Sequence, residues 1–241
     1  MDKQQLHMSI QEADNISLRY GAANRILQLL QKQRHSNNEN SEKRWIWELC
    51  QNAKDACNST GKVKISINFD ENSKKVLFKH NGKAFSMANI MSLINQTSSK
   101  DRGHGNERKS GKFGTGFITT HLLSEIVNIS GIMESDQKSN LEYSKFNIVL
   151  DRTGKEKDQV IAAMQRAVNN LERNVSINML EYNIDAYNTQ FEYDLNEYGV
   201  QVAKDGLENL RVSAPYVLAM LLDIEEIAVE NTGERFRYSK E

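Results

Sequence analysis

Two kinds of hydrophobic periodicity alternate along this chain, and they restrict its fold more than any other feature. Apolar residues recur at helical intervals in residues 10–33, 42–58, 87–94, 116–125, 158–173 and 197–222. Pro215 interrupts the last of these segments and predicts a break there, with a new helix opening after Ser213. Strand-type apolar segments lie between and after them, at residues 63–69, 76–78, 126–133, 143–150, 184–193 and 224–238. This order predicts an α/β (α+β) two-layer sandwich: a mixed, mostly antiparallel sheet with helices on one face.

Composition excludes several classes of protein. The chain has 241 residues, of which 39% are apolar and 26% charged. A chain of this length and apolar content can bury one hydrophobic core without a disulfide or a metal. The formal net charge of -1 gives no general attraction to nucleic acid or to an anionic membrane. The first residues, MDKQQLHMSIQEAD, lack the apolar core of a signal peptide, and no run of about 18 apolar residues occurs. We therefore expect a soluble cytoplasmic protein with no membrane partner and no indication of nucleic acid.

The domain organisation is suggested by two less regular regions. Residues 96–112 are polar, contain glycine and have no apolar period, so we expect a mobile loop there. Residues 224–238 form two strand-like segments around a turn, which is an unusual place for a domain to end. We expect residues 1–223 to be the main domain. Residues 224–241 would be its C-terminal strands or the start of a following domain in a larger protein that is truncated here.

One of the predicted helices has a polar stripe opposite an apolar one. Glu48, Asn52 and Asp55 are spaced i, i+4 and i+7, which places them within a band of roughly 60° around the helix. Such a stripe ordinarily marks only the solvent side of a surface helix. It gains meaning only together with a second motif.

That second motif is a glycine-rich run before an apolar helical segment. Its residues are Gly111-Lys112-Phe113-Gly114-Thr115-Gly116-Phe117. Glycines allow backbone N–H groups to approach a phosphate closely at a helix N-terminus. The run lacks the Gly-Lys-Ser/Thr ending of a Walker A loop and is not a Rossmann fingerprint.

Together these motifs resemble a known superfamily. The segment Glu48 to Ala56, ELCQNAKDA, is similar to the E-L-x-x-N-A-x-D-A box of the GHKL superfamily, which includes gyrase, heat-shock protein 90, histidine kinases and MutL. The run from Gly111 to Phe117 is similar to the G-x-F-G-x-G-F motif that closes the ATP lid in that superfamily. Phe78 to Phe85, FKHNGKAF, followed by a Ser-Ser-Lys, resembles the middle motif of the heat-shock-protein-90 branch, particularly of sacsin-like proteins.

The resemblance implies a Bergerat ATP-binding fold over roughly residues 10 to 195 and a site for Mg-ATP. Asn52 would coordinate Mg²⁺ and Glu48 would orient and deprotonate the attacking water, with Asp55 on the same helix face. Amide oxygens suit Mg²⁺, and a carboxylate one helical turn away can reach water at the γ-phosphate. Lys100, Lys112 and the glycine amides would neutralise the phosphates. Solvated lid charges are an alternative interpretation for Lys100, Arg102, Arg108 and Lys109.

The middle motif departs from the family at His80. The family has an aspartate there that accepts a hydrogen bond from the adenine amino group. A neutral imidazole nitrogen of His80 can accept that bond, and so can Asn81, which precedes Gly82. Thr189, in Asn188-Thr189-Gln190-Phe191, weakly resembles the Gly-Thr motif of a late strand that helps to bind adenine.

We therefore predict an ATPase whose lid, near residues 96–112, closes on the nucleotide. Closure would switch the conformation or dimerisation of a larger homodimeric protein, in chaperone-like remodelling or antiviral defence, with an unidentified client or partner. One alternative is a nucleotide-sensing scaffold that does not hydrolyse. Another is a histidine-kinase-type phosphotransfer domain, which Glu48, Asp55 and the absence of a preceding phosphoacceptor region disfavour.

Overall fold

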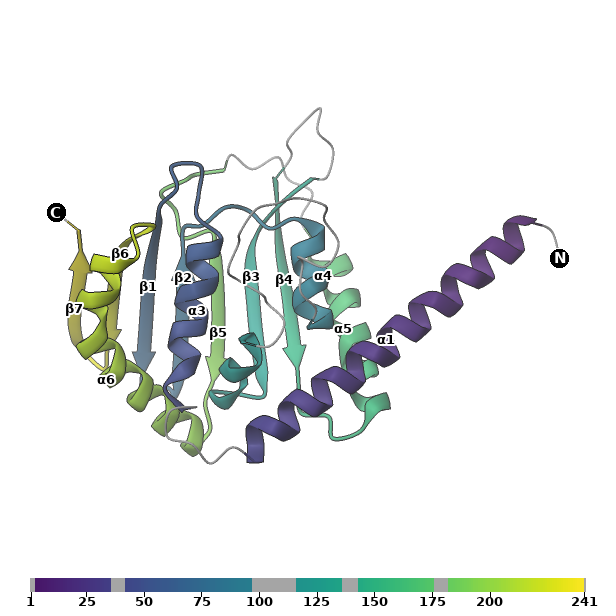
Figure 1. The fold of residues 1–241 in the computed structure, drawn as a ribbon, viewed down its shortest axis with the longest axis horizontal. Helices are drawn as coiled ribbons and strands as arrows, with labels where there is room; N and C mark the ends of the chain where they lie inside the picture. The colour runs from purple at the N-terminus through teal and green to yellow at the C-terminus, as the bar shows by residue number, and fades with distance from the viewer. Residues whose placement is uncertain (1–2, 36–41, 97–115, 136–142, 176–181, 241) are drawn as a thin grey trace.

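The computed structural model describes residues 3–35, 42–96, 116–135, 143–175 and 182–240. Helices and strands alternate in it much as the periodicity predicts (Figure 1). The helices are α1 (Lys3–His35), α3 (Arg44–Asp55), α4 (Met87–Asn95), the 3₁₀ helix η2 (Phe117–Leu122), α5 (Lys157–Asn174) and α6 (Glu197–Met220). The strands are β1 (Val63–Asp70), β2 (Lys75–His80), β3 (Ile126–Glu134), β4 (Tyr143–Asp151), β5 (Thr189–Asp194), β6 (Ile224–Asn231) and β7 (Glu234–Ser239).

Among the described residues, the strands form one seven-stranded sheet in the order β4-β3-β5-β2-β1-β6-β7. Neighbouring strands are antiparallel except β1 and β6, which run parallel. The prediction of a mixed, mostly antiparallel sheet is thus confirmed. Residues 224–239 extend this sheet beyond β1, so they belong to the same layer as the strands before them.

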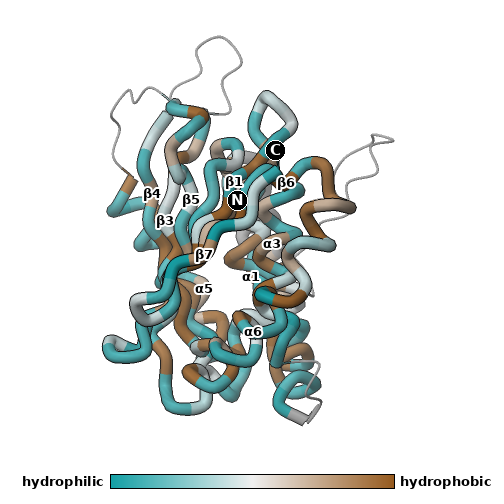
Figure 2. Tube along the Cα trace, turned by 90° about the vertical axis from the view of Figure 1, so that its left-hand side faces the viewer, coloured by the Kyte–Doolittle hydropathy of each residue, from teal (hydrophilic) through white to brown (hydrophobic). Residues whose placement is uncertain are grey.

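Among the residues that the structure describes, the helices cover one face of the sheet (Figure 1). In β1, Val63, Ile65, Ile67 and Phe69 are buried, whereas the residues between them are half-buried. The buried set faces the helices, as expected when alternate side chains point to opposite sides of a strand. Figure 2 shows this arrangement from the side, with β3, β4 and β5 on one side and α3 and α6 on the other. Within the described ranges, no helix combines the length and apolar character needed to cross a membrane.

The segment after the glycine-rich run is a short 3₁₀ helix rather than the longer helix expected at 116–125. The hydroxyls of Thr119 and Thr120 donate to the carbonyls of Gly116 and Phe117, each three residues earlier, at 2.8 Å. Such local bonds compete with the i to i−4 pattern of an α-helix. The backbone bond from Thr119 to Gly116 follows the same tighter spacing.

Other element boundaries also differ from the prediction. Helix α1 begins at Lys3 rather than near residue 10. Strand β5 begins at Thr189 rather than at residue 184. The preceding residues turn around Asn183, whose side chain accepts from the Asp185 amide at 2.9 Å and whose carbonyl accepts from the Asn188 side chain at 2.8 Å. Such local bonds of asparagine favour a turn over a strand.

Helix α6 continues through Pro215, where the sequence predicts a break. Proline removes the hydrogen bond that the carbonyl four residues earlier would accept, here that of Arg211. The hydroxyl of Tyr238 on β7 donates to that carbonyl at 3.1 Å. A side chain from the sheet therefore replaces the missing helical bond, and the helix persists.

Candidate functional site

Helix α3, which carries the predicted catalytic residue Glu48 and the predicted metal ligand Asn52, packs against α6. The indole of Trp45 donates to the Val202 carbonyl at 3.0 Å, and that of Trp47 donates to the Asn209 side chain at 2.7 Å. Trp45 lies so close to Gly206 that a β-carbon there would stand 2.7 Å from the ring atom Cε2. These contacts fix the rotation of α3 and so the direction in which its polar stripe points.

The polar stripe of α3 is buried at Asn52 and half-buried at Glu48 and Asp55. Asn52 is only 5% exposed, and the Glu48 side chain is 24% exposed. The Asn52 side-chain nitrogen is buried and has no hydrogen-bond partner in the described part of the chain. Asp55 accepts a hydrogen bond from Gln51 at 3.0 Å. A buried amide with an unused donor is uncommon on an ordinary surface helix, because burial without a partner costs free energy.

The carboxylate of Glu48 lies against Gly116, at the start of η2. A β-carbon at Gly116 would stand 2.5 Å from Glu48 Cδ and 2.9 Å from Oε1. Burial raises the pKa of Glu48 above its ordinary value, and Arg44, 3.6 Å away, opposes that rise. α3 and η2 thus place a partly desolvated carboxylate next to the last glycine of the glycine-rich run. A carboxylate with a raised pKa is a stronger proton acceptor.

His80 and Thr189 lie side by side on β2 and β5, where they are register partners. His80 is 2% exposed, and burial lowers the pKa of its imidazole to about 3, so the ring is neutral at physiological pH. Its Nδ1 accepts a hydrogen bond from the Gly82 amide at 3.1 Å. In a neutral ring with Nδ1 as acceptor, Nε2 carries the hydrogen. The remaining nitrogen is therefore a donor, not the acceptor that the sequence leads one to expect.

Asn81 uses both ends of its amide within the protein. Its Oδ1 accepts from the Lys64 backbone amide at 2.6 Å, and its Nδ2 donates to the Ile184 carbonyl at 2.9 Å. The side chain thereby joins β1 to the segment before β5. This bonding gives Asn81 a structural role next to the site.

Gly82 connects the middle motif to the end of α3. A β-carbon there would stand 2.5 Å from the Ala56 carbonyl and 2.7 Å from His80 Nδ1, so only glycine fits. The Lys83 amide donates to the same Ala56 carbonyl at 2.8 Å, and the Tyr182 hydroxyl donates to the Gly82 carbonyl at 2.7 Å. The turn after His80 is therefore held closely against α3.

An aromatic cluster and a hydroxyl that makes no hydrogen bond in the described part of the chain lie next to His80. Phe191 stacks on His80 with ring centroids 6.3 Å apart and planes 28° apart, and Phe117 of η2 lies 5.7 Å from Phe191. The Thr189 hydroxyl is buried and has no hydrogen-bond partner among the described residues. Polar groups with unused capacity thus occur on both α3 and β5, on the buried side of the sheet.

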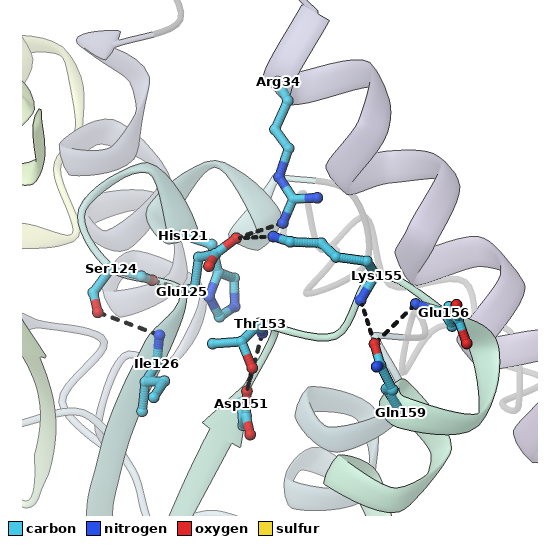
Figure 3. A network of polar contacts seen from close by, with 10 residues as sticks. All are labelled: Arg34, His121, Ser124, Glu125, Ile126, Asp151, Thr153, Lys155, Glu156 and Gln159. Carbon is cyan, nitrogen blue, oxygen red and sulfur yellow. Dashed lines mark hydrogen bonds and ion pairs between the residues drawn. The ribbon is translucent and has the colours of Figure 1, made fainter.

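A network of polar contacts anchors the other end of η2 (Figure 3). Glu125 accepts from Arg34 of α1 and from Lys155, which precedes α5, the latter at 2.8 Å. His121 Nδ1 donates to the Ser124 carbonyl at 3.3 Å, and burial lowers the pKa of this ring to about 3. These contacts tie the segment between η2 and β3 to α1 and to the residues just before α5.

Several predicted site residues lie outside the described residues. These are Lys100, Gly111, Lys112, Phe113, Gly114 and Thr115, together with most of the predicted lid. The described part of the chain brings Glu48 to Gly116, His80 to Thr189, and Gly82 to the end of α3. In the same described ranges, no three His, Cys, Asp or Glu side chains gather as a metal-binding group.

Three neighbours of the site were not singled out from the sequence. Arg44 stands four residues before Glu48, a helical spacing that could have identified it. Phe191 follows Thr189 by two residues, and strand periodicity places both on the same face. Tyr182 has no comparable local signal, because its contact with Gly82 depends on the tertiary fold.

Comparison with protein-family models gives no match for this chain, and comparison with curated proteins gives none either. The geometry of the site and the motifs in the sequence are therefore the basis for a functional proposal.

Proposed function

We propose that this chain has a Bergerat-type fold and binds and hydrolyses a magnesium nucleoside triphosphate, for which the sequence resemblance implies ATP. The observation that supports this most is the contact of Glu48 with Gly116. It joins the carboxylate of the first motif to the glycine-rich run of the second, although the two are far apart in the sequence. A helix that merely covered a core would not need a desolvated carboxylate at that point.

In this proposal, Asn52 binds the metal ion and Glu48 acts on the attacking water. Asn52, one helical turn beyond Glu48, offers an amide oxygen, and Mg²⁺ is commonly held by few protein ligands together with substrate phosphates. The metal ion would neutralise charge on the phosphates. Glu48 would orient the attacking water and take its proton, and its raised pKa favours that step.

The purine base of the nucleotide would lie toward the buried ends of β2 and β5. His80 and the Thr189 hydroxyl face that region beside each other, and Phe191 supports the His80 ring. In this proposal, turnover is coupled to closure of the lid at residues 96–112 and to a conformational or dimerisation switch in a larger cytoplasmic protein. Chaperone-like remodelling and antiviral defence are both consistent with such a switch.

Two variants separate binding from turnover. Glu48→Ala should leave the affinity for Mg-ATP within about tenfold of wild type and abolish hydrolysis, because Glu48 acts on water. Asn52→Ala should weaken both, because it removes a ligand of the metal that bridges the phosphates. Glu192→Ala is the matched control, since Glu192 lies on β5 and pairs with Lys75 away from the site.

Calorimetry measures binding and a phosphate-release assay measures turnover. Normal hydrolysis by Glu48→Ala would show that Glu48 is not the catalytic base. Binding without hydrolysis in the wild-type protein would instead favour a nucleotide-sensing scaffold. Absence of magnesium-dependent binding would reject the proposal as a whole.

A further inference from the structure

The hydrogen bond from the Gly82 amide to His80 determines what His80 can offer to a ligand. An imidazole nitrogen that accepts a hydrogen bond uses its lone pair, so the hydrogen of the neutral ring is on Nε2. The short turn between the two residues holds this bond, because the Tyr182 hydroxyl donates to the Gly82 carbonyl and the next amide, that of Lys83, donates to the Ala56 carbonyl. His80 is therefore a fixed hydrogen-bond donor.

Thr189 adds a second group with different properties. Its side chain lies on the same buried face as His80, directly across the β2–β5 pair. The hydroxyl is buried without a partner in the described part of the chain, and a hydroxyl can both donate and accept. The two side chains therefore present a fixed donor next to an adaptable group.

We infer that this site binds 6-oxopurine nucleotides, such as ITP or GTP, at least as tightly as ATP. The inference rests on the proposed nucleotide site. A 6-oxopurine presents an acceptor, O6, beside a donor, N1–H, and these complement the His80 N–H and the Thr189 hydroxyl. Adenine presents a donor, its amino group, beside an acceptor, N1. An amino group placed opposite the His80 N–H would bring two donors together, which leaves both unpaired.

Adenine can avoid this conflict by turning a ring nitrogen that accepts, such as N1, toward His80. Purine riboside triphosphate, which has N1 but no substituent at C6, distinguishes that arrangement from the one inferred here. If His80 donates to N1, this analogue should bind as tightly as ATP and more tightly than ITP. If His80 donates to O6, it should bind more weakly than ITP.

The test is a titration of the magnesium complexes of ATP, ITP and purine riboside triphosphate into the Glu48→Ala protein, in which turnover is blocked. ITP should bind with a Kd equal to or below that of ATP. His80→Asp, added to the same background, replaces the donor with an acceptor and should shift the ratio of affinities toward ATP by at least about tenfold. Circular dichroism would establish that this variant is folded.

The outcomes are distinguishable. ATP binding more than about tenfold tighter than ITP in the background protein would overturn the inference while leaving the proposed function intact, and this comparison does not depend on the folding of His80→Asp. An unchanged ratio in folded His80→Asp would also overturn it. Failure of all the nucleotides to bind would reject the proposed function itself.

Discussion

Replacing Gly116 by alanine would test whether Glu48 must lie where the structure places it. The backbone of Gly116 has φ −72° and ψ −45°, a helical conformation that alanine adopts readily. The obstacle is steric, since the added carbon would stand 2.5 Å from Glu48 Cδ. Carbon atoms in contact are normally about 3.5–4.0 Å apart, so the carboxyl group must move by about 1–1.5 Å.

A displacement of this size should affect turnover far more than binding or stability. Misplacing a catalytic group by about 1 Å can reduce the rate about 100-fold, or about 2.7 kcal/mol in activation free energy. The end of a glutamate side chain moves easily, so the melting temperature should change little. Phosphate release and calorimetry on the same preparation would measure kcat and Kd separately.

The matched control is Gly21→Ala on α1, where an added β-carbon meets nothing within 4 Å. This variant should hydrolyse nucleotide normally and gain about 0.5–1 kcal/mol in stability, because alanine favours a helix. If Gly116→Ala kept a kcat within about threefold of wild type, the position of Glu48 would not matter for turnover and the reasoning would be refuted.

Two further predictions concern stability. Burial raises the pKa of Glu48, so its ionised form is less favourable in the folded protein than in the unfolded one. Glu48→Gln should therefore melt at a higher temperature than wild type at pH 7. The difference in melting temperature should disappear below pH 4.5, the ordinary pKa of a glutamate, and equal melting temperatures at pH 7 would contradict the prediction. Asn81→Ala should destabilise the fold by about 1–3 kcal/mol, because it leaves the Lys64 amide and the Ile184 carbonyl unpaired. Denaturant unfolding would measure this loss against Asn147→Ala at an exposed position of β4, and equal stabilities would show that the two bonds contribute nothing.

Periodicity in the sequence was sufficient to predict most elements and the character of the sheet. The alternation of Val63, Ile65, Ile67 and Phe69 predicts β1 because burial on one face follows directly from that pattern. Side-chain hydrogen bonds, some of them from distant segments, decided several exceptions. Pro215 should end a helix, but a distant Tyr238 replaces the bond that it removes, and no local pattern reveals that.

The candidate site was less predictable, because its geometry depends on contacts between distant segments. The polar stripe of α3 is visible in the sequence, but its burial depends on how α3 packs against the rest of the fold. The residue type at position 80 indicates a group that can donate or accept. The Gly82 amide decides that the second ring nitrogen of His80 donates, because it occupies Nδ1 as the acceptor. Only the folded turn brings that amide to Nδ1.

The strand order also has a consequence for how the molecule folds. The pairs β1–β2 and β3–β4 each join strands that are neighbours in the sequence, whereas β5 inserts between them and β6 then pairs with β1. Contacts between distant segments form slowly, because closing long loops costs chain entropy. His80 and Thr189 come together only when β5 takes its place. We therefore expect a nascent chain to gain the proposed nucleotide affinity late, at the step that unites these two hairpins. Pulsed hydrogen exchange that protected β5 before either hairpin would contradict this order.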